Sequence, residues 1–599
     1  MNTLKTVGVV ALATLLSAQA RCENENKPRF RDEAIRAEMD GQWEEALRIH
    51  RAHIAVESQR ADLWIRIADI ENKLGHTNAM VEAAEHAAWI SPDDVEAWRR
   101  LSRSYAVAGR PADALFAINR ALFLGHDNVD DLRSRSQIAN WLGKTDLAAE
   151  SFRLLLDLVP DDIEARLALA RALSWSGALE GAAGAYERYL EARPRDIGVL
   201  LELERVHAWR GNFAAAMSVL KRYKEAGGDA ALLERETVKV LAAADKARSA
   251  LPRIERILEA SPDDFEVIFA RTIAHNFDRQ PAETLADLEL LGKIRPGSED
   301  IVNLRRTALV PMKSFIRATG RYYTDSDDLD IEHVHAENES ALSPGRRILA
   351  DAGVTWLSAP VGTGLENADG TTEAMSWFGR VGLAYLLSRE VDLRGLAGVS
   401  WAEDGTTPVF SLQADYRPSE CLRLKAELER GHLLVSPRTV SKRVTDTFAR
   451  LAAEWRPGFS STVVAGGRYD DYSDGNRRWE GTIAPRRAVV RSSLCNLDLG
   501  LRAQGFGFSD NLDGGYYDPG TYQQYAGTMH LFVKLSPDSG IGLVAAAGWF
   551  KDDSMNGYDF GWSADGELTV GAYRDWMLKL AAGAYENFRP EEAQGFRAY

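Results

Sequence analysis

The sequence has few cysteines, no long apolar run beyond its first residues and no excess of basic residues. Its 599 residues include three cysteines, which are too few for a disulfide framework. Cys421 and Cys495 lie near separate predicted turns, and we expect them to remain unpaired. No run of about 18 apolar residues occurs after residue 20, so no helical membrane span is predicted. The net charge of −16 argues against nucleic acid as a partner, because its phosphates require a basic face.

Motifs for common catalytic and cofactor sites are also missing. The sequence has no Gly-rich phosphate loop, no paired CxxC motif and no HExxH motif, which are the usual signatures of nucleotide and zinc sites. We therefore expect no cofactor, no metal site and no catalytic residue. The expected class is a protein other than an enzyme.

The first twenty residues have the pattern of a secretory signal peptide. Lys5 supplies a positive charge, residues 7–16 are apolar, and Ala18 and Ala20 form a cleavage site. The alternative is an N-terminal anchor or a buried first helix. Cys22 suggests a lipoprotein, but a small residue normally precedes a lipidated cysteine and Arg21 stands there. We predict cleavage after Ala20 and a mature chain outside the inner membrane of a bacterium.

A period of 34 residues covers the N-terminal half. Glycines recur at this interval at Gly41, Gly75, Gly109, Gly143, Gly177 and Gly211. Prolines separated by multiples of it are Pro92, Pro160, Pro194, Pro262 and Pro296. Five positions after the glycines stand Ala46, Met80, Ala114, Ala148, Ala182 and Ala216. The interval is that of the tetratricopeptide repeat, a helix–turn–helix unit. Residues 28–311 therefore resemble a tetratricopeptide superhelix of about eight repeats.

Stacked repeats of this kind bury a shared core and expose a long concave surface. We expect this surface to bind a partner protein; a spacer that only projects the next domain is the alternative. Trp141, Trp175 and Trp209 recur at one repeat position, and we expect inter-repeat packing there rather than a ligand-stacking ladder. Asp245 and Arg279 occupy the next two glycine positions, which predicts degenerate terminal repeats.

From residue 312 the hydrophobic period changes from helical to alternating. Alternate residues from 422 to 428 are apolar, and Arg423, Lys425 and Glu427 stand between them. A soluble sandwich would turn its apolar face inward. The predicted strands, at about 10–13 residues, exceed the roughly 5–6 residues of typical globular strands and reach the 9–11 residues of a membrane strand.

Loop lengths and aromatic residues favour the membrane alternative. Short turns near 388–390, 418–420, 457–458 and 537–540 alternate with longer polar connections at 361–373, 434–443, 510–520 and 554–558, as in outer-membrane barrels. We expect an interfacial girdle of Tyr322, Tyr323, Trp377, Phe378, Trp455, Tyr469, Tyr472, Tyr516, Tyr517, Trp549, Phe550, Trp562 and Trp576. Residues 312–599 are predicted to form an antiparallel transmembrane β-barrel of about 16 strands, the last beginning at Gly595. The fold class is multidomain α + β, an all-α superhelix followed by this barrel.

A signal peptide, a repeat superhelix and a barrel together resemble the bacterial exopolysaccharide export porins, which export biofilm polymers such as poly-N-acetylglucosamine, the Pel polysaccharide or cellulose. Residues 472–477 and 515–519 look like loop motifs of these barrels. The resemblance implies a barrel in the outer membrane that conducts the polymer. It also implies periplasmic repeats that bind a polymer-modifying or synthase-complex protein.

Alternation along the strands gives candidates for the lining of the lumen. These are Asp415, Arg423, Lys425, Glu427, Glu429, Glu454, Arg468, Asp470, Glu480, Asp498, Arg502, Asp565, Glu567 and Lys579. Acidic residues outnumber basic ones in the C-terminal half, which suits a partly deacetylated, cationic polymer. The alternative is that these charges pair with one another and solvate a water-filled wall.

Two other classes of function fit less well. A receptor or assembly scaffold with a barrel anchor would use the same repeats and would have a plugged or narrow barrel. An enzyme could use Glu427 and Glu429 as an acid–base pair, since the carboxyl groups of glycosidases lie about 5–9 Å apart. Without a surrounding motif, we expect this pair to line the lumen and carry no chemistry.

Overall fold

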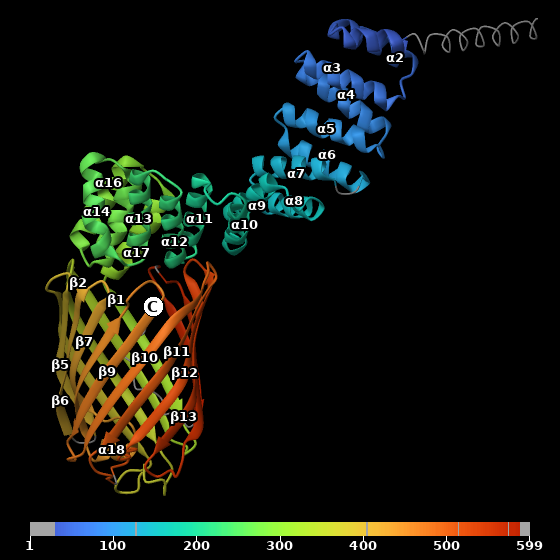
Figure 1. The fold of residues 1–599 in the computed structure, drawn as a ribbon. Helices are drawn as coiled ribbons and strands as arrows, with labels where there is room; N and C mark the ends of the chain where they lie inside the picture. The colour runs from blue at the N-terminus through green and yellow to red at the C-terminus, as the bar shows by residue number, and fades with distance from the viewer. Residues whose placement is uncertain (1–29, 126–127, 403–404, 513, 573, 587–599) are drawn as a thin grey trace, which may run out of the picture. The chain divides into compact units, whose positions relative to one another are not determined.

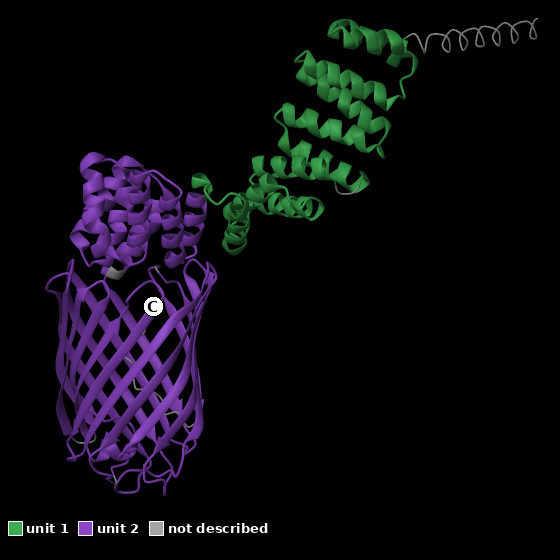
Figure 2. Ribbon diagram, in the orientation of Figure 1, with its two compact units in different colours: residues 1–199 green, residues 200–599 purple. Residues whose placement is uncertain are grey.

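The computed structural model describes residues 30–125, 128–402, 405–512, 514–572 and 574–586. It divides into two compact units, Met1–Val199 and Leu200–Tyr599 (Figure 2). The boundary falls within the helical repeats rather than at the change from helices to strands. The predicted signal peptide and Cys22 lie outside the described residues. Among the described residues, no helix is long and apolar enough to cross a membrane.

Helices that pack against their sequence neighbours build the first unit (Figure 1). Residues 30–39 are helical. The helices that follow are α2 (Trp43–Val56), α3 (Ala61–Lys73), α4 (Thr77–Ile90), α5 (Val95–Val107), α6 (Pro111–Gly125), α7 (Val129–Trp141), α8 (Thr145–Leu158), α9 (Ile163–Trp175) and α10 (Leu179–Ala192). The predicted superhelix of helix pairs is confirmed.

The repeat glycines stand in the turns between paired helices. All six have φ between +68° and +80°, the left-handed region that residues with a Cβ atom enter at a cost. Five positions later, the small residues of the repeat pack in the core, where Ala46, Ala114 and Ala148 are fully buried. Met80 holds this position in the second repeat and is also buried.

Aspartates cap the first helix of several repeats. The side chains of Asp94, Asp162 and Asp264 accept hydrogen bonds from backbone N–H groups at the starts of α5, α9 and α15. These groups have no partner inside the helix, and a side-chain cap of this kind contributes about 1 kcal/mol.

Repeats continue into the second unit. Its helices are α11 (Ile197–Trp209), which begins just before the boundary, α12 (Phe213–Glu225), α13 (Ala230–Ala243), α14 (Ala247–Ala260), α15 (Phe265–Phe277), α16 (Pro281–Ile294), α17 (Glu299–Leu309) and the 3₁₀ turn η1 (Val310–Met312). Strands begin directly after this turn.

The rest of the second unit is one antiparallel sheet of 15 strands in sequence order. They are β1 (Phe315–Thr324), β2 (Asp330–Ser343), β3 (Arg346–Ser358), β4 (Glu373–Leu386), β5 (Val391–Ala402), β6 (Gly405–Ser419), β7 (Leu422–His432), β8 (Thr445–Trp455), β9 (Ser461–Tyr472), β10 (Arg477–Arg491), β11 (Cys495–Phe508), β12 (Tyr522–Ser536), β13 (Ser539–Asp552), β14 (Asp559–Val570) and β15 (Leu578–Glu586). The predicted sixteenth strand, from Gly595, lies outside the described residues.

This sheet rolls up so that its two edges approach each other (Figure 1). The rings of Tyr323 on β1 and Tyr585 on β15 stack with centroids 6.4 Å apart, and their hydroxyls are hydrogen-bonded. Among the described residues no backbone ladder joins these two strands. The sheet therefore forms a cylinder. Among the described residues, side chains make the contact between its first and last strands.

Connections at the two ends of the cylinder differ in length, as predicted. The long ones span residues 359–372, 433–444 and 509–521 and lie at one end, which we call the far rim. Short turns such as 387–390, 420–421 and 537–538 lie at the other end, the near rim. A five-residue helix, α18 (Pro437–Ser441), lies within the second of the long loops.

The aromatic residues expected in a girdle divide between the two faces of the sheet. Trp377, Trp455 and Trp549 are about half exposed on the outer face. Tyr472 and Phe550 instead pack into a buried cluster on the inner face. The girdle prediction is therefore wrong for part of its set, because neighbouring aromatics on a strand point to opposite faces.

Both described cysteines, Cys421 and Cys495, are free thiols. They belong to different turns of the near rim, which is why the prediction of no pairing between them is correct.

Candidate functional site

The register of the sheet places all fourteen predicted lining residues on one face. Across four strands, for example, Glu427 stands opposite Arg450, Arg450 opposite Arg468, and Arg468 opposite Glu480. Directly opposed residues share a face, and so do residues two apart on one strand. The alternation read from the sequence therefore selects one continuous polar surface.

Hydrogen bonds between strands that are not neighbours show that this face is the inside of the cylinder. Arg380 on β4 donates to Glu429 on β7, with N and O 3.0 Å apart. Arg394 on β5 donates to Glu339 on β2 over 2.8 Å. Side chains three strands apart reach each other only across the concave side of a curved sheet.

Apolar side chains cover the opposite, outer face. Leu412, Leu451 and Leu501 are 50%, 60% and 65% exposed. In water, contiguous exposed leucines on many strands would be a strong association hazard. The arrangement is polar inside and apolar outside, the reverse of a soluble sheet protein.

Most of the predicted lining charges form ion pairs with other inner-face residues. Arg423 bonds Asp415 over 3.1 Å, and Arg450 bonds Glu427 over 3.3 Å. Further pairs are Glu454–Arg456, Asp470–Arg468, Glu480–Arg478, Asp498–Arg491 and Glu567–Lys579. Lys425 and Arg502 are partly buried, and Asp565 is exposed. Most of the predicted lining charges therefore have a partner of opposite charge.

Several charged residues of the inner face are absent from the predicted set. Arg380 bonds both Asp351 on β3 and Glu429 on β7, and Asp446 accepts from Arg468. Arg380 is the one charged residue between Ala374 and Leu386. A lone charge in an otherwise apolar strand is the signal that could have found it.

Glu427 and Glu429 bond different partners on the inner face. Glu427 accepts from Gln413 and Arg450, while Glu429 accepts from Arg380. Each carboxylate is thus bonded to a different arginine. The structure thus supports the interpretation of these residues as lumen lining.

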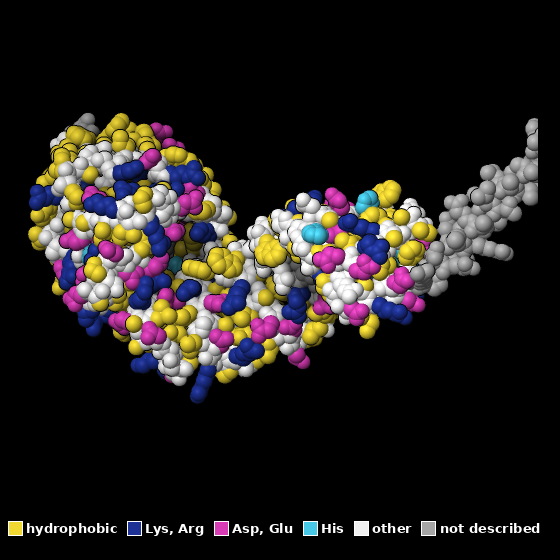
Figure 3. Space-filling view, turned by 90° about the horizontal axis from the view of Figure 1, so that it is seen from above, with side chains coloured by type: hydrophobic (Ala, Val, Ile, Leu, Met, Phe, Trp, Pro, Cys, Tyr) yellow, Lys and Arg dark blue, Asp and Glu magenta, His cyan; other side chains and the backbone are white. Residues whose placement is uncertain are grey.

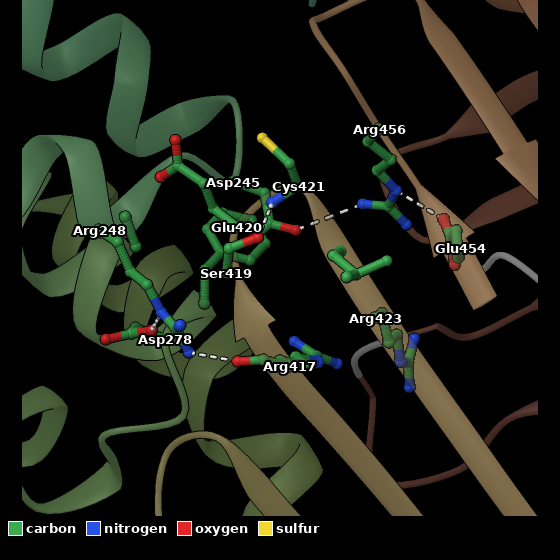
Figure 4. Close-up of a pocket in the computed structure, with 13 residues that line it drawn as sticks. Asp245, Arg248, Asp278, Arg417, Ser419, Glu420, Cys421, Arg423, Glu454 and Arg456 are labelled. Atoms are coloured by element: carbon green, nitrogen blue, oxygen red, sulfur yellow. Dashed lines mark hydrogen bonds and ion pairs between the residues drawn. The ribbon is translucent and has the colours of Figure 1, made fainter.

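Helices α13–α16 are fixed to the turns of the near rim by hydrogen bonds. Arg248 on α14 donates to the carbonyls of Pro418 and Arg417 over 2.7 and 2.8 Å, and to Asp278 over 3.1 Å (Figure 4). Ser249 donates to Glu420 over 2.6 Å. The Arg248 guanidinium therefore links α14 and the turn after α15 to the turn between β6 and β7.

The two residues that replace repeat glycines both contact this rim. Asp245 and Arg279 each have a φ of 57°, so the turns keep their left-handed geometry at a cost of about 1–2 kcal/mol each. Arg279 bonds Asp415 over 2.8 Å, and Asp245 lies 3.4 Å from Arg456. The irregular positions of the repeat are thus the positions that hold the helices on the rolled sheet.

Two cavities lie between these helices and the rim. The first, which we call the rim pocket, is small, and most of its lining residues are charged, among them Asp245, Arg248 and Glu420 (Figure 4). Phe277 also lines it. The second has a volume of about 290 Å³ and is lined in part by Arg279, Arg347 and Arg394. Its size is close to the lower end, roughly 300 Å³, of typical ligand sites.

Loops of the far rim fold inward and pack on the inner face. Val440 of α18 packs against Leu357, Ala374 and Ala402, which the register places on the same face as the lining residues. Ser436 caps α18 and is fully buried with Thr439. We call residues 359–372, 433–444 and 509–521 the far-rim plug.

The three loops of the plug are bonded to one another. The N–H of Arg438 donates to the carbonyl of Leu365 over 2.9 Å. The Ser436 hydroxyl donates to the carbonyl of Gly515 over 2.5 Å. The central loop therefore holds both of the others in place.

The two predicted loop motifs, residues 472–477 and 515–519, meet beside this plug. The rings of Tyr472 and Tyr516 stack with centroids 5.4 Å apart, and Tyr516 donates to Asp474 over 2.8 Å. Buried Asn476 donates to Asp518 over 3.3 Å. The motifs form one packed element that closes over the inner-face aromatics.

No protein-family model matches the sequence. No curated protein matches it either. Among solved structures, a bacterial polysaccharide outer membrane secretin has 15% identity and a TM-score of 0.36, covering 46% of this chain and 99% of that one. YrrB, a TPR protein with an unusual peptide-binding site, has 18% identity and a TM-score of 0.28, covering 31% and 95%. MamA has 17% identity and a TM-score of 0.27, covering 28% and 92%. Similarities of this extent do not assign a function.

Proposed function

We propose that this protein is an outer-membrane porin that exports an exopolysaccharide through the lumen of its rolled sheet. The periplasmic repeats bind a protein of the polymer-modifying or synthase complex. The observation that carries the proposal is the polarity of the sheet, ion-paired inside and apolar outside. Only lipid makes such an outer face favourable.

The size of the sheet fits a conduit. Fifteen described strands enclose more space than eight, which side chains almost fill, and approach the 16–18 strands of porins with an aqueous channel. A sugar polymer presents hydroxyl groups along its whole length. A wall of paired charges offers it many weak hydrogen bonds, so the chain can slide by exchanging one partner for the next.

In this proposal, the lengths of the connections between strands give the orientation of the protein in the membrane. Outer-membrane barrels have short periplasmic turns and long extracellular loops. The near rim, which carries α13–α16, is then periplasmic, and the far-rim plug is extracellular. Polymer enters past the helices and leaves where the plug opens.

One observation favours a second function. The far-rim plug packs tightly on the inner face, as it would in a receptor or scaffold whose barrel is only an anchor. The two functions differ in whether the plug moves.

Deletion of the gene in its host tests the proposal. We expect surface polymer to disappear and periplasmic polymer to accumulate, with recovery on expression of the full chain. Unchanged surface polymer, with loss of a periplasmic protein from the envelope complex, would favour the scaffold. Fractionation of the envelope serves as the control for localisation.

A further inference from the structure

Three tryptophans end the first helices of consecutive repeats. Trp141, Trp175 and Trp209 are the last residues of α7, α9 and α11, and they are 66%, 79% and 60% exposed. The sequence predicts that they pack between repeats, and this prediction is wrong. Packing alone does not explain an exposed indole at the same position in three successive repeats.

Other tryptophans of the first unit show what a packed indole looks like in this fold. Trp64 stacks on His86 with ring centroids 4.5 Å apart. The Trp98 indole N–H donates to the Pro92 carbonyl over 2.9 Å. Trp141 and Trp175 differ from both: within the described part of the chain, neither has such a ring contact or hydrogen bond.

The same repeat position is apolar and exposed elsewhere in the chain. Met39 and Val107 hold it in earlier repeats and are 82% and 59% exposed. Phe277 holds it in the second unit, where it lines the rim pocket. One surface position, repeated along the helices, therefore carries a large apolar side chain in most repeats.

Polar side chains surround these rings. One helical turn before the three tryptophans stand Gln137, Arg171 and Arg205, all exposed. Figure 3 shows apolar side chains in small groups among acidic and basic ones on the face in view. A protein partner would need a continuous apolar core at this surface. Isolated flat indole rings with hydrogen-bond donors beside them instead suit a polymer whose own rings carry polar groups.

We propose that Trp141 and Trp175 are stacking platforms for the pyranose rings of the transported polysaccharide, and that Trp209 is an equivalent platform in the second unit. This inference rests on the proposed function. It assigns the exported polysaccharide a binding site on the repeats. Each indole covers the apolar face of one sugar ring. Gln137, Arg171 and Arg205 donate hydrogen bonds to sugar hydroxyl or carbonyl oxygens.

Calorimetric titration of the full-length protein in detergent tests this assignment. The probes are cellohexaose and the hexamer of N-acetylglucosamine, which share pyranose rings and differ in substituents. We expect at least one probe to bind, and the double variant W141A/W175A to weaken that binding about tenfold, since an aromatic contact is worth roughly 0.5–1.5 kcal/mol. The variant W141Y/W175Y, which keeps two flat rings, should retain most of the affinity.

Trp89→Ala is the matched control, because Trp89 is 77% exposed but lies in α4, the second helix of its repeat. Unchanged binding in W89A supports the assignment. Absence of binding to the native protein, equal affinity in W141A/W175A, or equal loss in W89A would overturn it. In the background that lacks residues 510–520 of the far-rim plug, single-channel conductance should be the same with and without W141A/W175A, so a failed binding site and a failed conduit give different results.

Discussion

The guanidinium of Arg380 on β4 lies 3.0 Å from the carboxylate of Glu429 on β7 and 2.8 Å from that of Asp351 on β3. The Arg380 cation thus pairs with two carboxylates on the inner face, one on the adjacent strand and one three strands away. This contact holds the three side chains together and leaves one more negative than positive charge among them.

Loss of that cation should change the ion selectivity of the lumen. In Arg380→Ala the carboxylates of Asp351 and Glu429 lose their shared partner, so we expect a stronger preference for cations. Reversal potentials in a salt gradient, recorded in the background that lacks residues 510–520, measure this selectivity. Arg487→Ala, which removes an arginine from the opposite face, should leave the potential unchanged. Equal selectivity in the two variants would contradict an inner position for Arg380.

The contact between helices and near rim should depend on Arg248. Arg248→Ala removes the donors to Pro418, Arg417 and Asp278. We expect faster hydrogen exchange in peptides that cover 387–390 and 417–421, because hydrogen bonds to a charged group are worth about 1.5–3 kcal/mol. Arg256→Ala on the same helix, where the arginine is exposed and bonds a carbonyl of its own helix, is the control. Unchanged exchange in R248A would mean that the helices are held by other contacts.

Two glycines near each other in sequence should respond oppositely to alanine. Gly177 has a φ of +80°, so Gly177→Ala should destabilise the repeats by about 1–2 kcal/mol. Gly184 lies inside α10 with nothing near its would-be Cβ, so Gly184→Ala should stabilise them by up to about 1 kcal/mol. Thermal unfolding followed by helical circular dichroism measures both shifts. A change of the same sign in both variants would contradict the repeat geometry.

Glu204 stands where the other repeats place small residues. It is almost fully buried and one of its carboxylate oxygens has no hydrogen-bond partner among the described residues. Burial, reinforced by the neighbouring Glu236, raises the pKa of Glu204 to about 8. The equivalent positions hold Ala68, Ser102, Ser136 and Ala170, all buried. A carboxyl group in this slot is tolerated because it is protonated.

Stability of the repeats in the second unit should therefore fall as pH rises. An unfolded glutamate has a pKa near 4.3, so its protonation favours the folded state fully below that pH. This contribution is lost between about pH 4 and pH 8, because the unfolded carboxyl ionises from about pH 4 while the folded one keeps its proton up to about pH 8. Glu204→Gln should raise the unfolding temperature at pH 8 and flatten its pH dependence. An unchanged pH profile in E204Q would show that another group controls it.

Much of this fold could be predicted from the sequence because its signals are local. The glycines of the 34-residue period give the helix pairs, and alternation gives long strands, which in the structure have 9 to 15 residues. The same alternation selects the inner-face charges. Alternation does not show which charges pair. Arg380 and Glu429 come together because the sheet curves, and the sequence of one strand does not reveal that curvature.

Contacts made by irregular segments were beyond prediction for a similar reason. Asp245 and Arg279 break the glycine series, and only their neighbours in space show that they bind the rim. The far-rim plug depends on hydrogen bonds between loops far apart in sequence. The exposure of Trp141 and Trp175 depends on how each repeat meets the next.

Single-channel conductance in a planar bilayer tests the central claim most directly. The full-length protein is compared with a variant that lacks residues 510–520 of the far-rim plug, each with neutral and cationic oligosaccharides. The account predicts little conductance in the native protein, a large steady conductance in the variant, and stronger block by the cationic sugar because acidic residues outnumber basic ones in this half of the chain. A variant that inserts into the bilayer and still does not conduct would contradict a conduit through the rolled sheet.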